Sequence, residues 1–200
     1  LSVTAGGAVT DSGNLNVTGT TTVSATGFDV TLDSAGNNFT GAVGVTGANV
    51  TLVDANGLVL GPSTISGNYL ATATAGNISN TGALLVTGNS TFTANGIGAS
   101  IAVGNLGNNF TGTVSFVGAG GLASVTVASL SALDLGALTL TGNLAVTSGG
   151  AITDSGVLTV GGTTTLTAGA NNITLNTAGN NFTGAVSVVS GNNVILVDSS

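Results

Sequence analysis

A five-residue motif, Asn-Asn-Phe-Thr-Gly, occurs three times in this chain, at intervals of 71 and 72 residues. The similarity extends beyond the motif, because residues 1–49 align with residues 144–192 without a gap and about 30 of the 49 positions are identical. A fixed internal period is the sequence signature of a repeat array. We expect the motif to have the same structural role in each copy, and its residues are Asn37, Asn38, Phe39, Thr40, Gly41, Asn108, Asn109, Phe110, Thr111, Gly112, Asn180, Asn181, Phe182, Thr183 and Gly184.

The middle copy is more diverged but can be traced, since residues 76–82 correspond to residues 150–156. The copies span about residues 1–68, 69–143 and 144–200, the last of them partial. Leu1 corresponds to Leu144, which follows directly on the preceding copy and is not a natural start. We therefore expect residues 1–200 to be one continuous segment of a longer array.

The charge inventory excludes several classes of function. The chain has no Lys, Arg or His, and its seven acidic residues are all Asp. Proteins bind nucleic acids chiefly through cations that neutralise phosphates, so we expect no nucleic-acid partner. The absence of cations also argues against polybasic attachment to an anionic membrane, and it removes His and Lys as general bases.

Neither a membrane span nor cross-linking is expected. Thr, Ser, Asn and Gly interrupt every apolar run before it reaches the roughly 18 residues that a spanning helix needs. Cysteine is absent, so stability must come from packing and hydrogen bonds. A chain without disulfides would also suit export in an unfolded state through a narrow pore.

Apolar residues alternate with polar ones in short bursts rich in Val, Ile and Thr, such as residues 30–32, 50–53, 138–140 and 173–175. Gly, Asn or Asp-Ser pairs bound each burst, a pattern typical of short strands joined by tight turns. Tandem immunoglobulin-like sandwiches are the alternative for a repeat of this length, but they require longer strands and more aromatic residues. The pattern favours an all-β fold, a right-handed parallel β-helix or β-solenoid.

In such a fold, turns of about 19 to 24 residues would place three to four turns in each copy and about nine in the chain, each rising about 4.8 Å. Val, Leu, Ile and Ala would stack in the core, while Thr, Ser and Asn would form outward ladders. The absence of charge suits this geometry, because like charges on neighbouring strands destabilise a sheet.

The sequence resembles the haemagglutinin-type repeats of large bacterial filamentous adhesins. The resemblance is carried by residues 142–156, 158–169 and 173–186 and extends over nearly the whole chain, more weakly over residues 99–135. It implies a β-helical shaft in a secreted protein of the two-partner or autotransporter type, located outside the cell or on the bacterial surface.

Candidate catalytic residues are scarce. Glycoside hydrolysis needs two acids placed across a bond, and Asp29 with Asp33 is the one close pair, whose counterparts in the third copy are Asn172 and Asn176. The other acids also vary between copies, since Asp11 corresponds to Asn80 and Asp54 to Ser129. We therefore expect no catalytic residues and no enzymatic activity, although a β-helical polysaccharide-active enzyme remains an alternative.

No metal or cofactor site is expected. The Gly-Gly-x-Gly-x-Asp consensus of calcium-binding β-rolls is absent, and isolated Asp residues such as Asp11, Asp54 and Asp154 fit turns in which the carboxylate accepts nearby N–H groups. Asn-x-Ser/Thr triplets are a consequence of composition. We interpret the Asn-Phe-Thr segments as structural corners with the phenylalanine packed against the coil.

The sequence thus predicts an extracellular structural protein whose partners are the neighbouring repeats of its own chain and, in a filament or bundle, further copies. A second hypothesis is a repetitive face that binds glycans on a host or other surface, or ice. Thr-x-Thr pairs such as Thr72 with Thr74 and Thr91 with Thr93 suggest it. The two are distinguished by whether Thr or Asn ladders run unbroken along one face.

Overall fold

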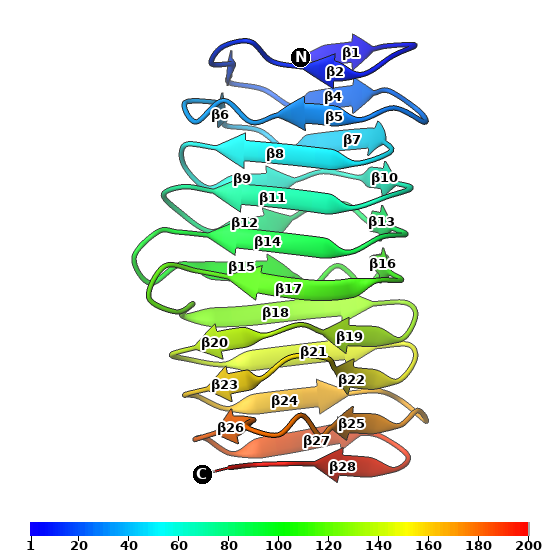
Figure 1. Ribbon diagram of the computed structural model, residues 1–200, viewed down its shortest axis with the longest axis vertical. Helices are drawn as coiled ribbons and strands as arrows, with labels where there is room; N and C mark the ends of the chain where they lie inside the picture. The colour runs from blue at the N-terminus through cyan, green and yellow to red at the C-terminus, as the bar shows by residue number, and fades with distance from the viewer. Residues whose placement is uncertain (200) are drawn as a thin grey trace.

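The computed structural model describes residues 1–199, and the regular structure of these residues is entirely β-strand. The chain winds as a solenoid in which every strand pair is parallel (Figure 1). Front strands such as β8 run to the left and rear strands such as β7 run to the right while the chain descends, so the coil is right-handed. The predicted all-β parallel solenoid is confirmed, and self-contained antiparallel sandwiches are excluded.

The strands belong to four sheets. The 13-stranded sheet holds β1 (Ser2–Thr4), β4 (Thr21–Ser24), β7 (Val43–Gly47), β9 (Leu58–Leu60), β10 (Ser63–Ile65), β12 (Ile78–Asn80), β13 (Leu84–Val86), β15 (Ser100–Val103), β16 (Asn109–Phe110), β18 (Ser124–Ser129), β21 (Leu144–Ser148), β24 (Thr164–Thr167) and β27 (Val186–Ser190). The 10-stranded sheet holds β2 (Val9–Thr10), β5 (Val30–Leu32), β8 (Val50–Asp54), β11 (Tyr69–Ala73), β14 (Ser90–Ala94), β17 (Thr113–Val117), β19 (Leu133–Leu135), β22 (Ile152–Asp154), β25 (Ile173–Leu175) and β28 (Val194–Leu196). The two small sheets are β20 (Leu138–Leu140), β23 (Leu158–Val160) and β26 (Asn181–Phe182), and β3 (Asn16–Val17) with β6 (Asn38–Phe39).

The strands are short because each spans one side of a narrow coil, and their alternation decides which side chains face inward. In β8, Val50 and Leu52 are buried while Thr51 and Val53 are half-buried on the outer surface. The inward residues of successive turns stack upon each other and form one continuous hydrophobic core along the axis. Each turn is therefore stabilised chiefly by the turns before and after it, as in other solenoids.

The register gives the length of each turn. Partners on successive turns lie 17 residues apart at Val43 and Leu60, and 24 residues apart at Ser90 and Val114. The 10-stranded sheet has nine steps between β2 and β28, which agrees with the nine turns predicted from the sequence. At about 4.8 Å a turn, the segment is about 43 Å long.

The copies are related by a half-turn of the coil. Each copy contributes ten strands, so that β1, β11 and β21 correspond, but β11 lies in the 10-stranded sheet while β1 and β21 lie in the 13-stranded one. From β2 to β22 the chain makes seven turns, which is two copies. One copy is therefore three and a half turns, and each copy faces the opposite side from the last.

The pairing of strands between successive turns is irregular at two places, which we call the first and second seam. On the next turn β7 is followed by both β9 and β10. Val43, at the start of β7, pairs with Leu60 of β9, while Thr46, near its end, pairs with Thr64 of β10. At the corresponding place in the middle copy, β17 pairs with β19 only through Thr113 and Val114, and Leu140 pairs with Leu122 instead. The second seam leaves part of β17 uncovered.

Within residues 1–199 there is no helix of the length and apolarity that a membrane-spanning segment requires.

Candidate functional site

The recurrent Asn-Asn-Phe-Thr-Gly motif forms a hydrogen-bonded link between successive turns. This link is centred on Asn37, Asn108 or Asn180, and we call it the fastening. Its first asparagine is completely buried in all three copies. The Oδ1 atom of Asn37, Asn108 or Asn180 accepts the backbone N–H of Leu15, Leu84 or Leu158 on the preceding turn, at 2.8, 2.9 and 2.8 Å respectively. A short polar side chain thus replaces the sheet hydrogen bonds that are lost where the chain turns a corner.

The amide nitrogen of the same asparagine is also engaged. Asn37 donates to Asp11 at 2.7 Å and Asn180 donates to Asp154 at 2.6 Å. In the middle copy the carboxylate is replaced by Asn80, which donates to Asn108 at 2.8 Å, while the Asn108 amide donates to the carbonyl of Val103. The fastening therefore tolerates exchange of Asp for Asn because the buried asparagine offers both a donor and an acceptor.

The other motif residues fit the same corner. Phe39, Phe110 and Phe182 are buried in the core. A Cβ atom at Gly112 would stand 2.5 Å from the carbonyl oxygen of Gly88 on the turn before, so glycine is needed for close approach of the two backbones.

The phenylalanine N–H is bonded by a side chain from the following turn. Phe39 donates to the buried carboxylate of Asp54 at 2.9 Å, Phe110 to the hydroxyl of Ser129 at 3.2 Å, and Phe182 to Asp198 at 3.2 Å. Each motif is therefore held by both adjacent turns.

The turn carboxylates work mainly across turns, which differs from the local turns that we predicted. Asp11 accepts the N–H groups of Asp33 and Ser34, and Asp154 accepts those of Asn176 and Thr177. These donors lie 22 or 23 residues away because, in a solenoid, the nearest free N–H groups belong to the next turn. Asp54 makes the predicted local contact, to the N–H of Asn56, in addition to the one with Phe39.

We expect the contribution of Asp11 to stability to be lost in acid. Burial alone would raise the pKa of its carboxyl, but hydrogen bonds from the Asn37 amide and from the N–H groups of Ser34 and Asp33 outweigh that effect and lower the pKa from its ordinary value. A group whose pKa is lowered on folding stabilises the fold above its unfolded pKa, about 3.9, and loses this effect as pH falls through the folded value. The difference in unfolding free energy between wild type and Asp11→Asn, measured by denaturation from pH 7 to pH 2, should therefore shrink below about pH 4. A difference that stays constant over this range would contradict the assignment.

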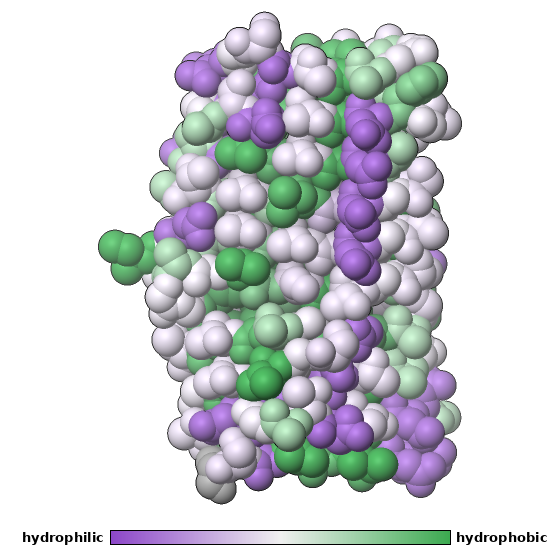
Figure 2. Space-filling view, in the orientation of Figure 1, coloured by the Kyte–Doolittle hydropathy of each residue, from purple (hydrophilic) through white to green (hydrophobic). Residues whose placement is uncertain are grey.

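A polar ladder runs along one side of the coil, first at the residues directly before β5, β8, β11 and β14 and then at residues within β17, β19 and β22. Its members are Asp29, Asn49, Asn68, Asn89, Thr113, Asp134 and Thr153, on seven consecutive turns. Each is hydrogen-bonded to the next, from Asn49 Nδ2 to Asp29 at 3.0 Å through Thr153 Oγ1 to Asp134 at 3.0 Å. Figure 2 shows hydrophilic side chains in a vertical line on the upper part of this face.

The half-turn relation places a second polar ladder on the other large sheet. Ser100 donates its N–H to Asn77 at 2.8 Å, the hydroxyls of Ser124 and Ser100 are 2.9 Å apart, and Thr163 donates its N–H to Asn143 at 2.8 Å. The ladder side chains bind one another and the backbone, so their hydrogen-bonding groups are largely used within the fold.

The threonine columns on the flat front face are interrupted. Thr51, Leu70, Thr91 and Ser115 share one column, and Val53, Thr72, Thr93 and Val117 share the next. Of these four turns, only β14 presents a complete Thr-x-Thr pair. A face that recognises a repeating lattice would need such pairs on every turn.

The acids of the candidate glycosidase pair flank β5 at its two ends and engage different partners. Asp29 accepts the N–H and amide of Asn49, both at 3.0 Å, while the backbone N–H of Asp33 donates to Asp11. Among residues 1–199, no group of three or more His, Cys, Asp or Glu side chains could hold a metal ion together.

Three inward hydroxyls occupy corresponding positions in the copies, at the first residue of β4, β14 and β24. Thr21, Ser90 and Thr164 are buried, and within the described part of the chain their oxygen atoms have no hydrogen-bond partner. Burial of an unpaired hydroxyl costs free energy, about 1–3 kcal/mol in proteins.

We expect removal of these hydroxyls to stabilise the fold. Thr21→Val and Thr164→Val should each raise the free energy of unfolding by about 1 kcal/mol, because valine keeps the shape of threonine and removes only the unpaired oxygen. The two sites are seven turns apart, so the effects should add. Chemical denaturation of the single and double variants would measure this, with the outward Thr165→Val as control. Destabilisation by either inward variant would show that its hydroxyl is satisfied in solution.

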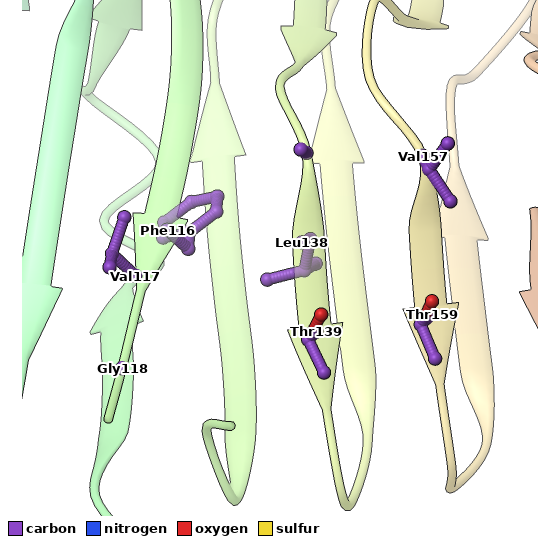
Figure 3. A pocket seen from close by; sticks show the side chains of 8 residues that line it. Phe116, Val117, Gly118, Leu138, Thr139, Val157 and Thr159 are labelled. Carbon is purple, nitrogen blue, oxygen red and sulfur yellow. The ribbon is translucent and has the colours of Figure 1, made fainter. Parts of the chain in front are cut away.

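A shallow groove of about 350 Å³ lies at the second seam, where β17 and β20 separate (Figure 3). Its floor includes the buried Phe116 and Leu138, and its rim includes Val117 and Val157. In the close-up view Thr139 lies on β20 beside Leu138, and Thr159 lies on β23, the strand that follows Val157. All of its lining residues are uncharged.

Sequence reasoning found the motif but missed the two polar ladders and the three buried hydroxyls. The signal for the ladders was an Asn, Asp, Ser or Thr directly before a strand in turn after turn, as at Asn49, Asn68 and Asn89. The buried hydroxyls gave no signal, since their threonines resemble the many outward ones.

Comparison with known proteins gives one match. A family described as Repeats of unknown function (DUF5649) matches residues 1–46, 47–117 and 122–189. The matched segments end at or close to the ends of the corresponding strands β7, β17 and β27, and residues 118–121, the insertion beside the groove, fall between them. No curated protein and no solved structure matches the chain. The matches cover most of the sequence, and the chain therefore belongs to the DUF5649 family of repeats.

Proposed function

We propose that this chain is a shaft segment of an extracellular filament, a stiff spacer of the kind found in bacterial surface adhesins. The observation that carries the proposal is the continuity of the core and of the 10-stranded ladder from β2 to β28, over nine steps. Because every turn is bonded to the next along the axis, the rod resists bending and separation at all points along its length.

The polar groups support a structural role. The carboxylates of Asp11, Asp54, Asp134 and Asp154 all accept hydrogen bonds from the protein itself. Acids committed to holding turns together are poorly placed to exchange protons with a substrate. The interrupted threonine columns likewise give less support to a face that binds ice or a regular glycan.

The composition suits a location outside the cell, on a bacterial surface. The chain contains no Lys or Arg, so trypsin-like proteases have no site of cleavage, and it contains no Cys that could form a disulfide before export. Resemblance to filamentous haemagglutinin-type repeats supports the same location. Antibodies raised against residues 1–199 should label intact cells that produce the protein as strongly as permeabilised ones, and labelling of permeabilised cells alone would refute this location.

The shaft hypothesis predicts a fixed gain in length per repeat. A chain extended by one further copy of residues 69–143 should lengthen by about 17 Å, three and a half turns at about 4.8 Å each, with no change in cross-section. Small-angle X-ray scattering of the original and extended proteins gives both quantities. A gain in cross-section, or flexible bending between copies, would contradict a role as a stiff spacer.

A further inference from the structure

Two Asn-Gly dipeptides occur in the chain, Asn56-Gly57 and Asn95-Gly96, and they lie at the same corner of the coil. They are two turns apart, because a Cβ atom at Gly96 would stand 2.7 Å from the nitrogen of Gly76, and one at Gly76 would stand 2.8 Å from the nitrogen of Gly57. Both asparagines are exposed. The two sites therefore have the same dipeptide and the same position in the coil, and they differ in how firmly the backbone is held.

An asparagine followed by glycine is prone to a reaction within the chain. Asparagine is among the thermolabile residues, and glycine has no Cβ atom to keep its nitrogen away from the preceding side chain. The glycine nitrogen can then attack the carbonyl carbon of the asparagine side chain. Such an intramolecular step needs the two atoms to approach within about 3–3.5 Å in the correct orientation. A backbone that is held on both sides cannot move into that geometry, so local freedom decides which dipeptide reacts.

The corner at residues 55–57 is held on both sides of its dipeptide. Three residues join β8 to β9 here. Asn56 donates its backbone N–H to the buried carboxylate of Asp54 at 2.7 Å. Leu58, the first residue of β9, donates its N–H to the carbonyl of Asn77 at 2.9 Å. The backbone on either side of the glycine is therefore fixed.

The loop at residues 95–99 is two residues longer and is held less firmly. The N–H of Asn95 is bonded to the turn before, but the next bonded N–H among the described residues is that of Ala99, 3.0 Å from the carbonyl oxygen of Gly96. Ile97, between them, is fully exposed. In Figure 1 the loop from β14 to β15 extends further to the left than the loops of the neighbouring turns. Gly96 therefore has a freedom of movement that the shorter corner does not allow.

We propose that Asn95 is a site of spontaneous deamidation, and that the fold protects Asn56 from the same reaction. In the first step the Gly96 nitrogen forms a bond to Cγ of Asn95, and the bond from Cγ to Nδ2 breaks. Ammonia leaves with the proton of the Gly96 N–H, and the product is a cyclic imide, a succinimide. Water then opens the ring at either of its two carbonyl groups, which gives aspartate or isoaspartate. Water is the one co-reactant, and no atom is oxidised or reduced.

The reaction places a charge on a loop that has none. Residues 95–99 contain no acid, and the product adds one negative charge to the formal net charge of −7. The loop lies outside the strands, so the extra backbone methylene of isoaspartate leaves the pairing of β14 with β17 and of β15 with β18 in place. Deamidation therefore marks the age of a molecule without breaking the coil, and it is independent of the shaft hypothesis.

Peptide mapping by mass spectrometry tests the proposal within one molecule. Folded protein is incubated at mildly alkaline pH, which favours loss of the proton from the glycine nitrogen. It is then cleaved with chymotrypsin, since the chain has no Lys or Arg for trypsin. Deamidation at Asn95 should be about tenfold faster than at Asn56, because the loop opens more easily than the corner. Equal rates at the two sites, or no reaction at Asn95, would overturn the proposal.

The same measurement in guanidinium chloride separates the effect of the fold from that of the sequence. Both dipeptides are flexible in the denatured chain, so their rates should agree within about twofold. If Asn95 kept its tenfold advantage there, neighbouring residues and not the structure would account for it, and the proposal would fail.

Labelling with isoaspartyl methyltransferase gives a second readout on folded protein. Wild type should accumulate label with time, and Asn95→Ser should accumulate about tenfold less, because its remaining Asn-Gly dipeptide is held by the fold. Circular dichroism checks that the variant is folded. Equal labelling of the two proteins would refute the site.

Discussion

Phe92→Ala is expected to lower the free energy of unfolding by about 5 kcal/mol, the largest single effect in this chain. Truncation of a buried phenylalanine to alanine costs about 3–5 kcal/mol, because it removes apolar area and leaves a cavity. Phe92 is buried, and its ring also contacts three others, with centroids 5.9 Å from Tyr69, 6.0 Å from Phe110 and 5.9 Å from Phe116. Aromatic pairs of this kind add about 0.5–1.5 kcal/mol each beyond the buried area.

Urea denaturation followed by far-ultraviolet circular dichroism measures this effect. Phe28→Ala is the matched control, because Phe28 is 45 % exposed and should cost less than about 1 kcal/mol when truncated. If Phe92→Ala and Phe28→Ala had equal costs, the aromatic cluster would not be a packed part of the core in solution.

Asn108→Ala is expected to lower the free energy of unfolding by about 3–5 kcal/mol. The substitution removes the acceptor of the Leu84 N–H and the donor to the Val103 carbonyl, and both groups lie in the interior of the fastening. Each buried polar group left without a partner costs about 1–3 kcal/mol. The loss of the bond from Asn80 adds to this cost, since its amide also donates to Asn108.

Asn109→Ala, at the next residue, is the matched control. It distinguishes the loss of the buried hydrogen bonds of Asn108 from the cost of any substitution within the motif. Asn109 is half-buried and accepts one hydrogen bond, from Ser131 at 2.6 Å, so its truncation should cost about 1 kcal/mol. Thermal and urea denaturation of both variants would show the difference. If Asn108→Ala were as mild as Asn109→Ala, water would have to replace the buried amide.

The sequence was sufficient to predict the class of the fold because one physical pattern is repeated throughout. Alternation such as Val50-Thr51-Leu52 fixes a strand with one buried face, and glycine and asparagine fix the corners. The period and the shortness of the strands together favoured a solenoid of about nine turns over tandem sandwiches.

The half-turn between copies could not be predicted in this way. It depends on the exact number of residues in each turn, which varies from 17 to 24, and no local pattern records that number. The same variation sets the aromatic cluster, because the longest turns lie in the middle copy, where Phe92, Phe110 and Phe116 fill the interior. Val23 and Leu166 occupy the position of Phe92 in the other copies.

The hydrogen bonds made by the motif could not be predicted from the sequence either. That Asn37, Asn108 and Asn180 recur was visible in the sequence, but the direction of their amides depends on which turn lies against them. The groove arises from an insertion in the middle copy, at residues 118–121, which has no counterpart in the periodic pattern. Features that recur were therefore predictable, and features confined to one copy were not.

The three-and-a-half-turn unit makes the orientation of anything joined to the rod depend on whether the number of repeats is odd or even. Gain or loss of a single repeat would swing the distal part by about 180° about the axis, so that a binding site once aimed outward would point back. Gain or loss of two repeats would change the length of the rod by about 34 Å, seven turns at about 4.8 Å, and would leave the orientation of the distal part unchanged. Natural variants that differ in length should accordingly differ by pairs.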